Sequence, residues 1–127
     1  MTEKMSKKRI HARLGPLVIK TAFTVGFDRR EGYLTNVGEG GGFLAIDDPP
    51  PLGTEIEIRA ILPWRLGELR AETRVVWRSH GGSEGSGKLS GVGLAFEELD
   101  PKARELLDAY LRKFTELAAR IEELQEG

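Results

Sequence analysis

The sequence contains no cysteine, which excludes disulfide bonds, thiolate metal ligands and cysteine nucleophiles. Its two histidines, His11 and His80, lie in a basic segment and in a loop rich in glycine and serine, and neither has the neighbours of a catalytic triad or a metal site. No apolar run approaches the roughly 20 residues that span a membrane, and no signal peptide is recognisable. We therefore expect a cytoplasmic protein that is not an enzyme, has no metal or cofactor and does not insert into a membrane.

Charge is nearly balanced over the 127 residues, with 19 Lys and Arg against 20 Asp and Glu. This balance argues against a protein that coats nucleic acid, and the length suits one domain with a modest core. The charge is unevenly distributed, because the end of the chain is acidic. The start has one acid, Glu3, among six bases: Lys4, Lys7, Lys8, Arg9, Arg13 and Lys20. An anion site is therefore expected near the N-terminus.

Short stretches of alternating apolar and polar residues predict β-strands at 17–25, 33–37, 43–46, 55–62, 69–78 and 92–96. Residues 28–32 predict a turn, residues 49–51 are three prolines that cannot stay in a sheet, and residues 80–90 predict a flexible loop. Strands this short, with no helix between them, favour a closed antiparallel barrel over a sandwich.

A different pattern follows Asp100, a good N-cap residue, and Pro101, which suits the first helical position. Apolar residues then recur at steps of four and three in a heptad pattern: Ala103, Leu107, Tyr110, Phe114, Leu117, Ile121 and Leu124. A helix over 101–126 would be nearly 40 Å long at about 1.5 Å per residue, more than a small barrel covers. We expect its first turns to pack on the barrel. The later turns have two interpretations: self-association through the heptad seam at 103–124, or a lid helix that frays beyond Phe114.

Two segments together predict an anion site. Arg9 and Arg13 lie four residues apart on the basic arm before the first strand, and guanidiniums bind phosphates and guanine edges through paired hydrogen bonds. Residues 36–42 contain four glycines, more than a hairpin needs, and the exposed amides of such a turn can hold an anion. The Asn36 side chain can cap the turn or bind a base edge. This pattern predicts a guanine nucleotide or another phosphorylated ligand, whereas the arm alone is also typical of a solvated tail.

Trp77 has two interpretations. It shares a strand face with Ala71, Thr73 and Val75, which favours packing in the core. It also lies near the end of its strand, where an aromatic ring can stack on a base.

The order of these motifs resembles the PilZ domain family, bacterial receptors for the second messenger cyclic di-GMP. Residues 9–13 match the RxxxR motif of the family's N-terminal arm, and residues 36–41 match its [D/N]xSxxG motif in part. Residues 91–96 match a late strand of alternating glycine and apolar residues that ends in phenylalanine, with a helix after it. The resemblance runs from about residue 7 to residue 114.

The resemblance implies a mainly β fold, with a flexible basic arm (1–13), a six-stranded antiparallel β-barrel (14–98) and a long C-terminal helix (99–127). The ligand would lie on the outer surface of the barrel and be held there by the arm. An unidentified protein effector would recognise the ligand-bound form. The implied ligand-binding residues are Lys8, Arg9, Arg13, Asn36, Gly38, Gly41, Gly42 and Trp77. By this carry-over the arginines, assisted by Lys8, contact guanine and phosphate groups, while Asn36 and the backbone around Gly41 contact a guanine.

The sequence departs from the family at Gly38, which stands where the motif has serine. The lost hydroxyl contact is worth about 1–3 kcal/mol, or one to two decades of affinity. The alternative function is therefore a degenerate domain that does not bind cyclic di-GMP and acts as a protein interaction module.

Overall fold

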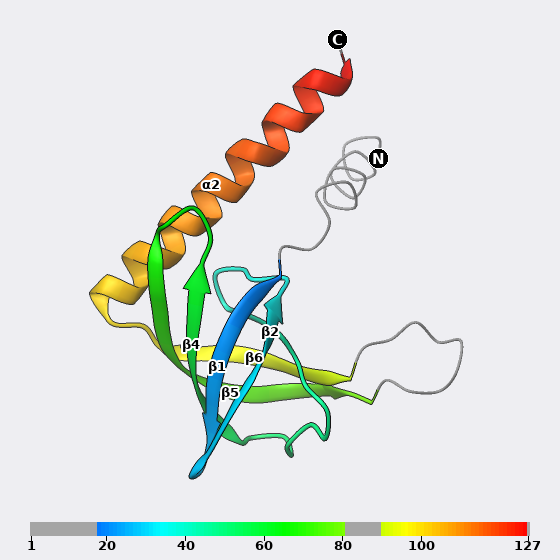
Figure 1. The fold of residues 1–127 in the computed structure, drawn as a ribbon, viewed down its shortest axis with the longest axis vertical. Helices are drawn as coiled ribbons and strands as arrows, with labels where there is room; N and C mark the ends of the chain where they lie inside the picture. Colours follow the sequence, from blue (N-terminus) through cyan, green and yellow to red (C-terminus); the bar gives the residue numbers. More distant parts are fainter. Residues whose placement is uncertain (1–17, 81–89, 127) are drawn as a thin grey trace.

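Six strands form a closed antiparallel barrel in the computed structural model, which describes residues 18–80 and 90–126 (Figure 1). The order around the barrel is β1-β2-β3-β6-β5-β4. The elements are β1 (Ile19–Val25), β2 (Asp28–Thr35), β3 (Gly41–Ala45), β4 (Glu55–Leu62), β5 (Gly67–Ser79), β6 (Gly91–Glu98) and helix α2 (Pro101–Glu126). The predicted fold class is confirmed. The basic arm and most of the loop at 80–90 lie outside the described residues.

The core fills the inside of the barrel with the apolar half of each alternating strand. In β4, for example, Ile56 and Ile58 are buried while Glu55 and Glu57 are exposed. Two buried threonines satisfy their hydroxyls on backbone carbonyls: Thr21 donates to Ile19 O at 2.9 Å and Thr73 to Ile56 O at 2.7 Å. The barrel is therefore a packed scaffold whose binding surfaces lie on the outside.

The predicted turn at 28–32 is wrong, because these residues form the first half of β2. The chain turns earlier, at Gly26, whose φ of 62° suits a tight hairpin. Residues 28–31 are charged and exposed, and their strand conformation comes from pairing with β1, where Ala22 faces Glu31 and Val25 faces Asp28.

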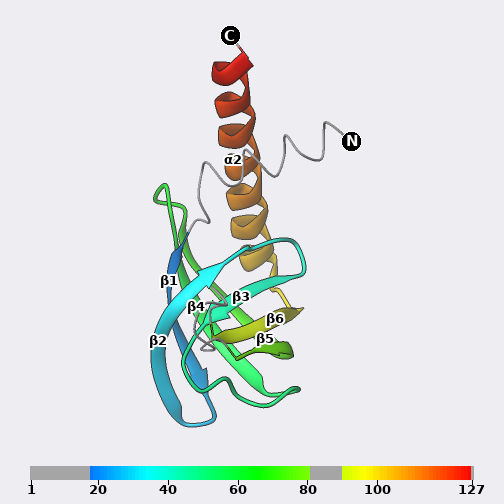
Figure 2. The same cartoon turned by 90° about the vertical axis from the view of Figure 1, so that its right-hand side faces the viewer.

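Helix α2 begins as predicted, since Asp100 Oδ1 accepts a hydrogen bond from the Ala103 amide at 2.7 Å. Its first turns bury Ala103, Leu107 and Tyr110 against the barrel, as expected. The ring of Tyr110 stacks on Trp64, in the turn between β4 and β5, at 5.6 Å. The rest of the helix extends away from the barrel (Figures 1 and 2).

Candidate functional site

The glycine-rich turn follows β2 and is held at two points. The amide of Gly38 donates to Gly41 O at 2.8 Å, which closes the turn, and the amide of Phe96 donates to Gly40 O at 2.8 Å, which fastens it to β6. Asn36 is exposed and has a φ of 52°, a left-handed conformation that asparagine tolerates better than most residues. The turn therefore presents the Asn36 amide group from a fixed backbone.

The four glycines of the turn have different roles. A Cβ at Gly41 would collide with the carbonyl oxygen of Leu94, and one at Gly42 would lie 3.1 Å from Thr35 O. A Cβ at Gly38 or Gly40 would meet nothing within 4 Å. Close strand packing therefore accounts for Gly41 and Gly42. Gly38 and Gly40 lie on open surface, and strand packing does not require glycine at either position.

Trp77 does not pack in the core, and the prediction that favoured core packing is wrong. A β-bulge between Val75 and Trp77 breaks the alternation of β5, so that Val75 is buried whereas Trp77 is 50% exposed. Trp77 pairs with Gly93 of β6, and Gly93 pairs with Phe43 of β3. The rings of Phe43 and Trp77 stack across this glycine with centroids 5.3 Å apart and planes 24° apart.

The alternating glycines of β6 make room for this aromatic pair. A Cβ at Gly93 would collide with the indole of Trp77. One at Gly91 would collide first with the carbonyl oxygen of Leu44 and would lie 2.6 Å from the Phe43 ring. The contribution of Phe43 was not predicted from the sequence. Its signal was the glycine at alternate positions of a strand, which marks the close approach of other groups.

Thr35, Phe43, Gly93 and Trp77 form one row across four neighbouring strands, from β2 through β3 and β6 to β5. The glycine-rich segment connects the β2 and β3 members of this row, because it runs from Thr35 to Phe43. Asn36 and Gly38 thus lie in the turn and Gly41 and Gly42 directly after it, at the start of β3. Trp77 lies on the same stretch of sheet through Phe43. Lys8, Arg9 and Arg13 lie outside the described residues.

The described chain begins beside this turn. Ile19 pairs with Leu34, so Val18 lies next to the end of β2 where Asn36 follows. The arm that carries the predicted arginines is therefore attached close to the predicted ligand site.

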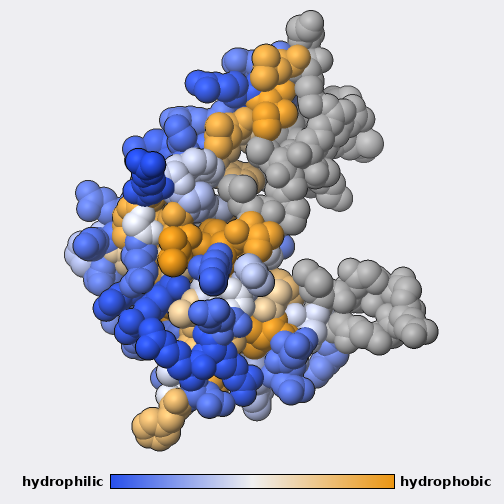
Figure 3. All heavy atoms as spheres, viewed as in Figure 1, coloured by the Kyte–Doolittle hydropathy of each residue, from blue (hydrophilic) through white to orange (hydrophobic). Residues whose placement is uncertain are grey.

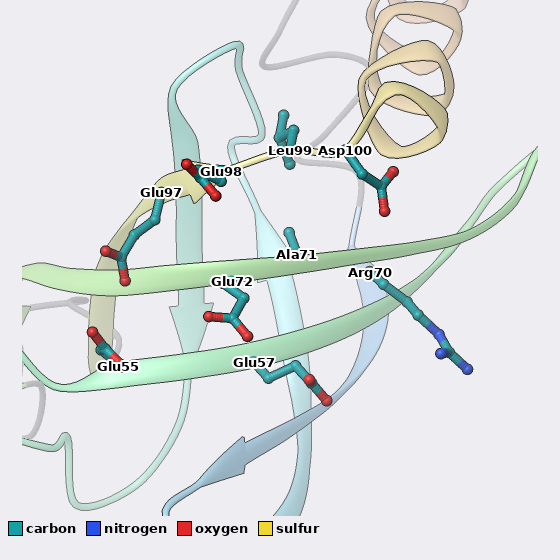
Figure 4. Close-up of a pocket in the computed structure, with 9 residues that line it drawn as sticks. All are labelled: Glu55, Glu57, Arg70, Ala71, Glu72, Glu97, Glu98, Leu99 and Asp100. Carbon is teal, nitrogen blue, oxygen red and sulfur yellow. The ribbon is translucent and has the colours of Figure 1, made fainter.

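A pocket of about 810 Å³ between β4, β5 and the end of β6 has a different character. Figure 4 shows Glu55, Glu72 and Glu97 gathered on one side of it, with Arg70 pointing away. Arg74 bridges Glu55 and Glu97 at 3.2 Å, and the hydrogen bond from Arg70 to Glu68 (2.8 Å) lowers the pKa of that carboxyl. So many carboxylates repel an anionic ligand. Among the described residues, no group of His, Cys, Asp or Glu could hold a metal ion.

Two comparisons with known proteins match this chain. Residues 7–113 match the model of the PilZ domain family. The structure resembles that of the inhibitor of motility MotI/DgrA of Bacillus subtilis with a TM-score of 0.64 and 14% sequence identity, over 79% of this chain and 48% of the other. The chain thus spans about half the length of that protein. No curated protein matches.

Within the two described segments, no helix is long and apolar enough to cross a membrane. The matched region, residues 7–113, contains the RxxxR motif, every strand of the closed barrel and the half of α2 that packs on it. The chain therefore belongs to the PilZ domain family.

Proposed function

We propose that this chain is a non-catalytic cytoplasmic receptor for cyclic di-GMP that binds its ligand between the N-terminal arm and the glycine turn and signals to a protein partner. The observation that carries the proposal is the outer face of the barrel at the turn. It combines a fixed, exposed Asn36, open space at Gly38 and Gly40, and an aromatic pair on the same stretch of sheet.

Each part of this face suits one part of a cyclic dinucleotide. The Asn36 amide can donate to and accept from a guanine edge. The exposed half of Trp77, backed by Phe43, offers a surface on which a base can stack, a contact worth about 1–3 kcal/mol. The arm supplies what the turn lacks, since Arg9 and Arg13, with Lys8, can neutralise the phosphates and bind the second base edge.

Calorimetry with cyclic di-GMP tests the proposal. The wild type should release or absorb heat in a saturable titration, and Arg9→Ala/Arg13→Ala should abolish it. A matched control is Arg104→Ala/Arg112→Ala, which removes the same charge from exposed positions of α2 and should bind like the wild type. If the wild type gives no heat at high micromolar ligand, the receptor function is wrong.

Gly38 distinguishes the receptor from a degenerate interaction module. A Cβ fits at this position without contact, so Gly38→Ser should fold normally and restore the hydroxyl of the family motif. If the wild type binds, we expect Gly38→Ser to bind about ten to a hundred times more tightly. If only Gly38→Ser binds, the second function, a protein interaction module without ligand, is the correct one.

Self-association is a further part of this proposal that light scattering tests. Ala103, Leu107 and Tyr110 are buried within one chain, so that only the outer half of the 103–124 seam is available to a second copy. A dimer through this half should be lost on truncation after Phe114, and equal monomer masses for both lengths would contradict it.

A further inference from the structure

The first half of β2 has a neighbouring strand on one side only. β2 pairs with β1 from Asp28 to Leu34, whereas it pairs with β3 over its last three residues alone. Among the described residues, positions 28–31 therefore have no ladder partner on the side away from β1, although the barrel as a whole is closed. We call residues 28–31 the free edge of β2.

The free edge presents unpaired backbone groups. A two-residue turn, Gly26–Phe27, joins β1 to β2, so the residues that flank this turn form a hydrogen-bonded pair. Because such pairs alternate along an antiparallel ladder, Arg29 and Glu31 direct both N–H and C=O away from β1. In residues 18–80 and 90–126 no backbone group bonds to them on that side. The edge is therefore a template for a further strand.

The side chains of the free edge restrict which strand can pair with it. All four are charged and exposed, and charges on an edge usually prevent pairing unless the neighbour matches them. Arg29 and Glu31 lie two residues apart and hence on one face. Arg30 lies on the other face, where its guanidinium is bound to Asp28 at 3.1 Å. A matching strand needs an acid opposite Arg29 and a base opposite Glu31.

A second copy of the same edge, running antiparallel, meets this requirement in one register. With a two-fold axis at residue 30, Arg29 of each copy faces Glu31 of the other, which gives two favourable cross-strand pairs. A shift by one residue would turn the unpaired backbone groups against groups already bonded to β1. A shift by two would place Arg29 opposite Arg29, or Glu31 opposite Glu31. Charge thus selects the register centred on residue 30.

The same axis brings an exposed aromatic side chain to a pocket. Phe27 is completely exposed at the hairpin tip, and Figure 3 shows hydrophobic atoms projecting from this end of the molecule. A pocket of about 420 Å³ lies between β2 and the end of β3, and its lining includes Phe23, Tyr33 and Ile46. Positions 27 and 33 lie three residues on either side of residue 30. The two-fold axis therefore places Phe27 of each copy beside Tyr33 of the other, at this pocket.

We infer that two copies of this chain associate antiparallel through residues 28–31 of β2, with Phe27 of each copy in the pocket of the other. Charge and shape agree on the same register, as the self-complementary surface of an isologous dimer requires. So short a ladder buries less than the roughly 800 Å² per partner of a standard interface, so the dimer forms reversibly at high concentration. It does not involve α2, whose outer half lies at the opposite end of the molecule (Figure 1).

Single cysteines test the register, because the chain has none of its own. The two copies of residue 30 form a pair without hydrogen bonds, with Cα atoms about 4.5 Å apart, which suits a disulfide. In the full chain, Arg30→Cys should therefore form a disulfide-linked dimer about tenfold faster than Arg29→Cys or Glu31→Cys, whose own copies lie about 8 Å apart. A mixture of Arg29→Cys and Glu31→Cys should link faster than either variant alone.

Charge reversal tests the contact without a covalent bond. Arg29→Glu places like charges opposite each other twice and should raise the dissociation constant of the dimer about tenfold in sedimentation velocity over a concentration series. Arg29→Glu/Glu31→Arg restores opposite charges in reverse order and should return to the wild-type value. The matched control, Arg104→Glu on the exposed side of α2, should leave association unchanged. Phe27→Ala should weaken it, because an aromatic anchor is lost.

Each outcome decides one part of the inference. If Arg30→Cys links no faster than its two neighbours, the axis at residue 30 is wrong. If Arg29→Glu weakens association and the double reversal does not restore it, the free edge does not pair with its own copy. A wild type that stays monomeric at the highest concentration, with no preferred disulfide, overturns the inference as a whole. None of these measurements requires cyclic di-GMP, so the receptor function and this interface can fail separately. Unchanged circular dichroism verifies the fold of each variant.

Discussion

The stack of Trp77 on Phe43 depends on the absence of a side chain at Gly93, and this dependence can be measured. In Gly93→Ala the new methyl group would collide with the indole, which must turn away. The variant loses the aromatic pair, worth about 0.5–1.5 kcal/mol, and forces the indole off its rotamer at a similar cost. Alanine in a strand returns about 0.5–1 kcal/mol relative to glycine. We expect a net loss of about 1 kcal/mol in the free energy of unfolding.

Once the indole is removed, the same substitution should raise the free energy of unfolding instead of lowering it. In a Trp77→Ala background the three atoms closest to a Cβ at residue 93 are gone, because all three belong to the indole. The gain of alanine over glycine should then determine the sign. The coupling energy between the two positions is then about 1–2.5 kcal/mol, within the range that contacting residues show in double-mutant cycles.

Urea unfolding of the four proteins of this cycle provides the measurement, with Gly38→Ala as a matched control. A Cβ at Gly38 meets nothing within 4 Å, so this variant should stay within about 0.5 kcal/mol of the wild type. A coupling energy near zero would refute the packing of Trp77 over Gly93, and with it the stacking surface proposed for the ligand.

Two further changes test other parts of the molecule. Asp100→Ala should lower the free energy of unfolding in urea by about 1 kcal/mol, because the Ala103 amide loses its acceptor, whereas Asp100→Asn should retain most of it. Burial raises the pKa of Tyr110 above its usual 10.0, so the unfolded state loses this proton first, and stability should fall as pH rises past 10; Tyr110→Phe should remove that part of the fall.

Local signals were sufficient for the elements whose stability is local. The start of α2 was predicted from Asp100 and Pro101, and its buried face from the spacing of Ala103, Leu107 and Tyr110. Strand β4 was predicted from strict alternation. In both cases one short stretch of sequence contains the cap or the periodicity that determines the structure.

Elements that depend on a distant partner were not predictable in this way. Residues 28–31 have the composition of a turn and form a strand because β1 pairs with them. The bulge before Trp77 shifts the register of β5 against β6, and no pattern within β5 marks it. The information was present in β6, where Gly93 leaves space for the indole, but its meaning depends on which strands are neighbours.

The ligand-binding residues named from the sequence stay a prediction, and the glycines among them were partly misinterpreted. The number of glycines after Asn36 suggested close approach of a ligand. Gly41 and Gly42 are instead required by the approach of β6 and of Thr35 in β2, and they would be expected in a barrel of this kind with or without a ligand. Asn36 and the open surface at Gly38 are therefore the parts of this segment that the packing of the barrel does not explain.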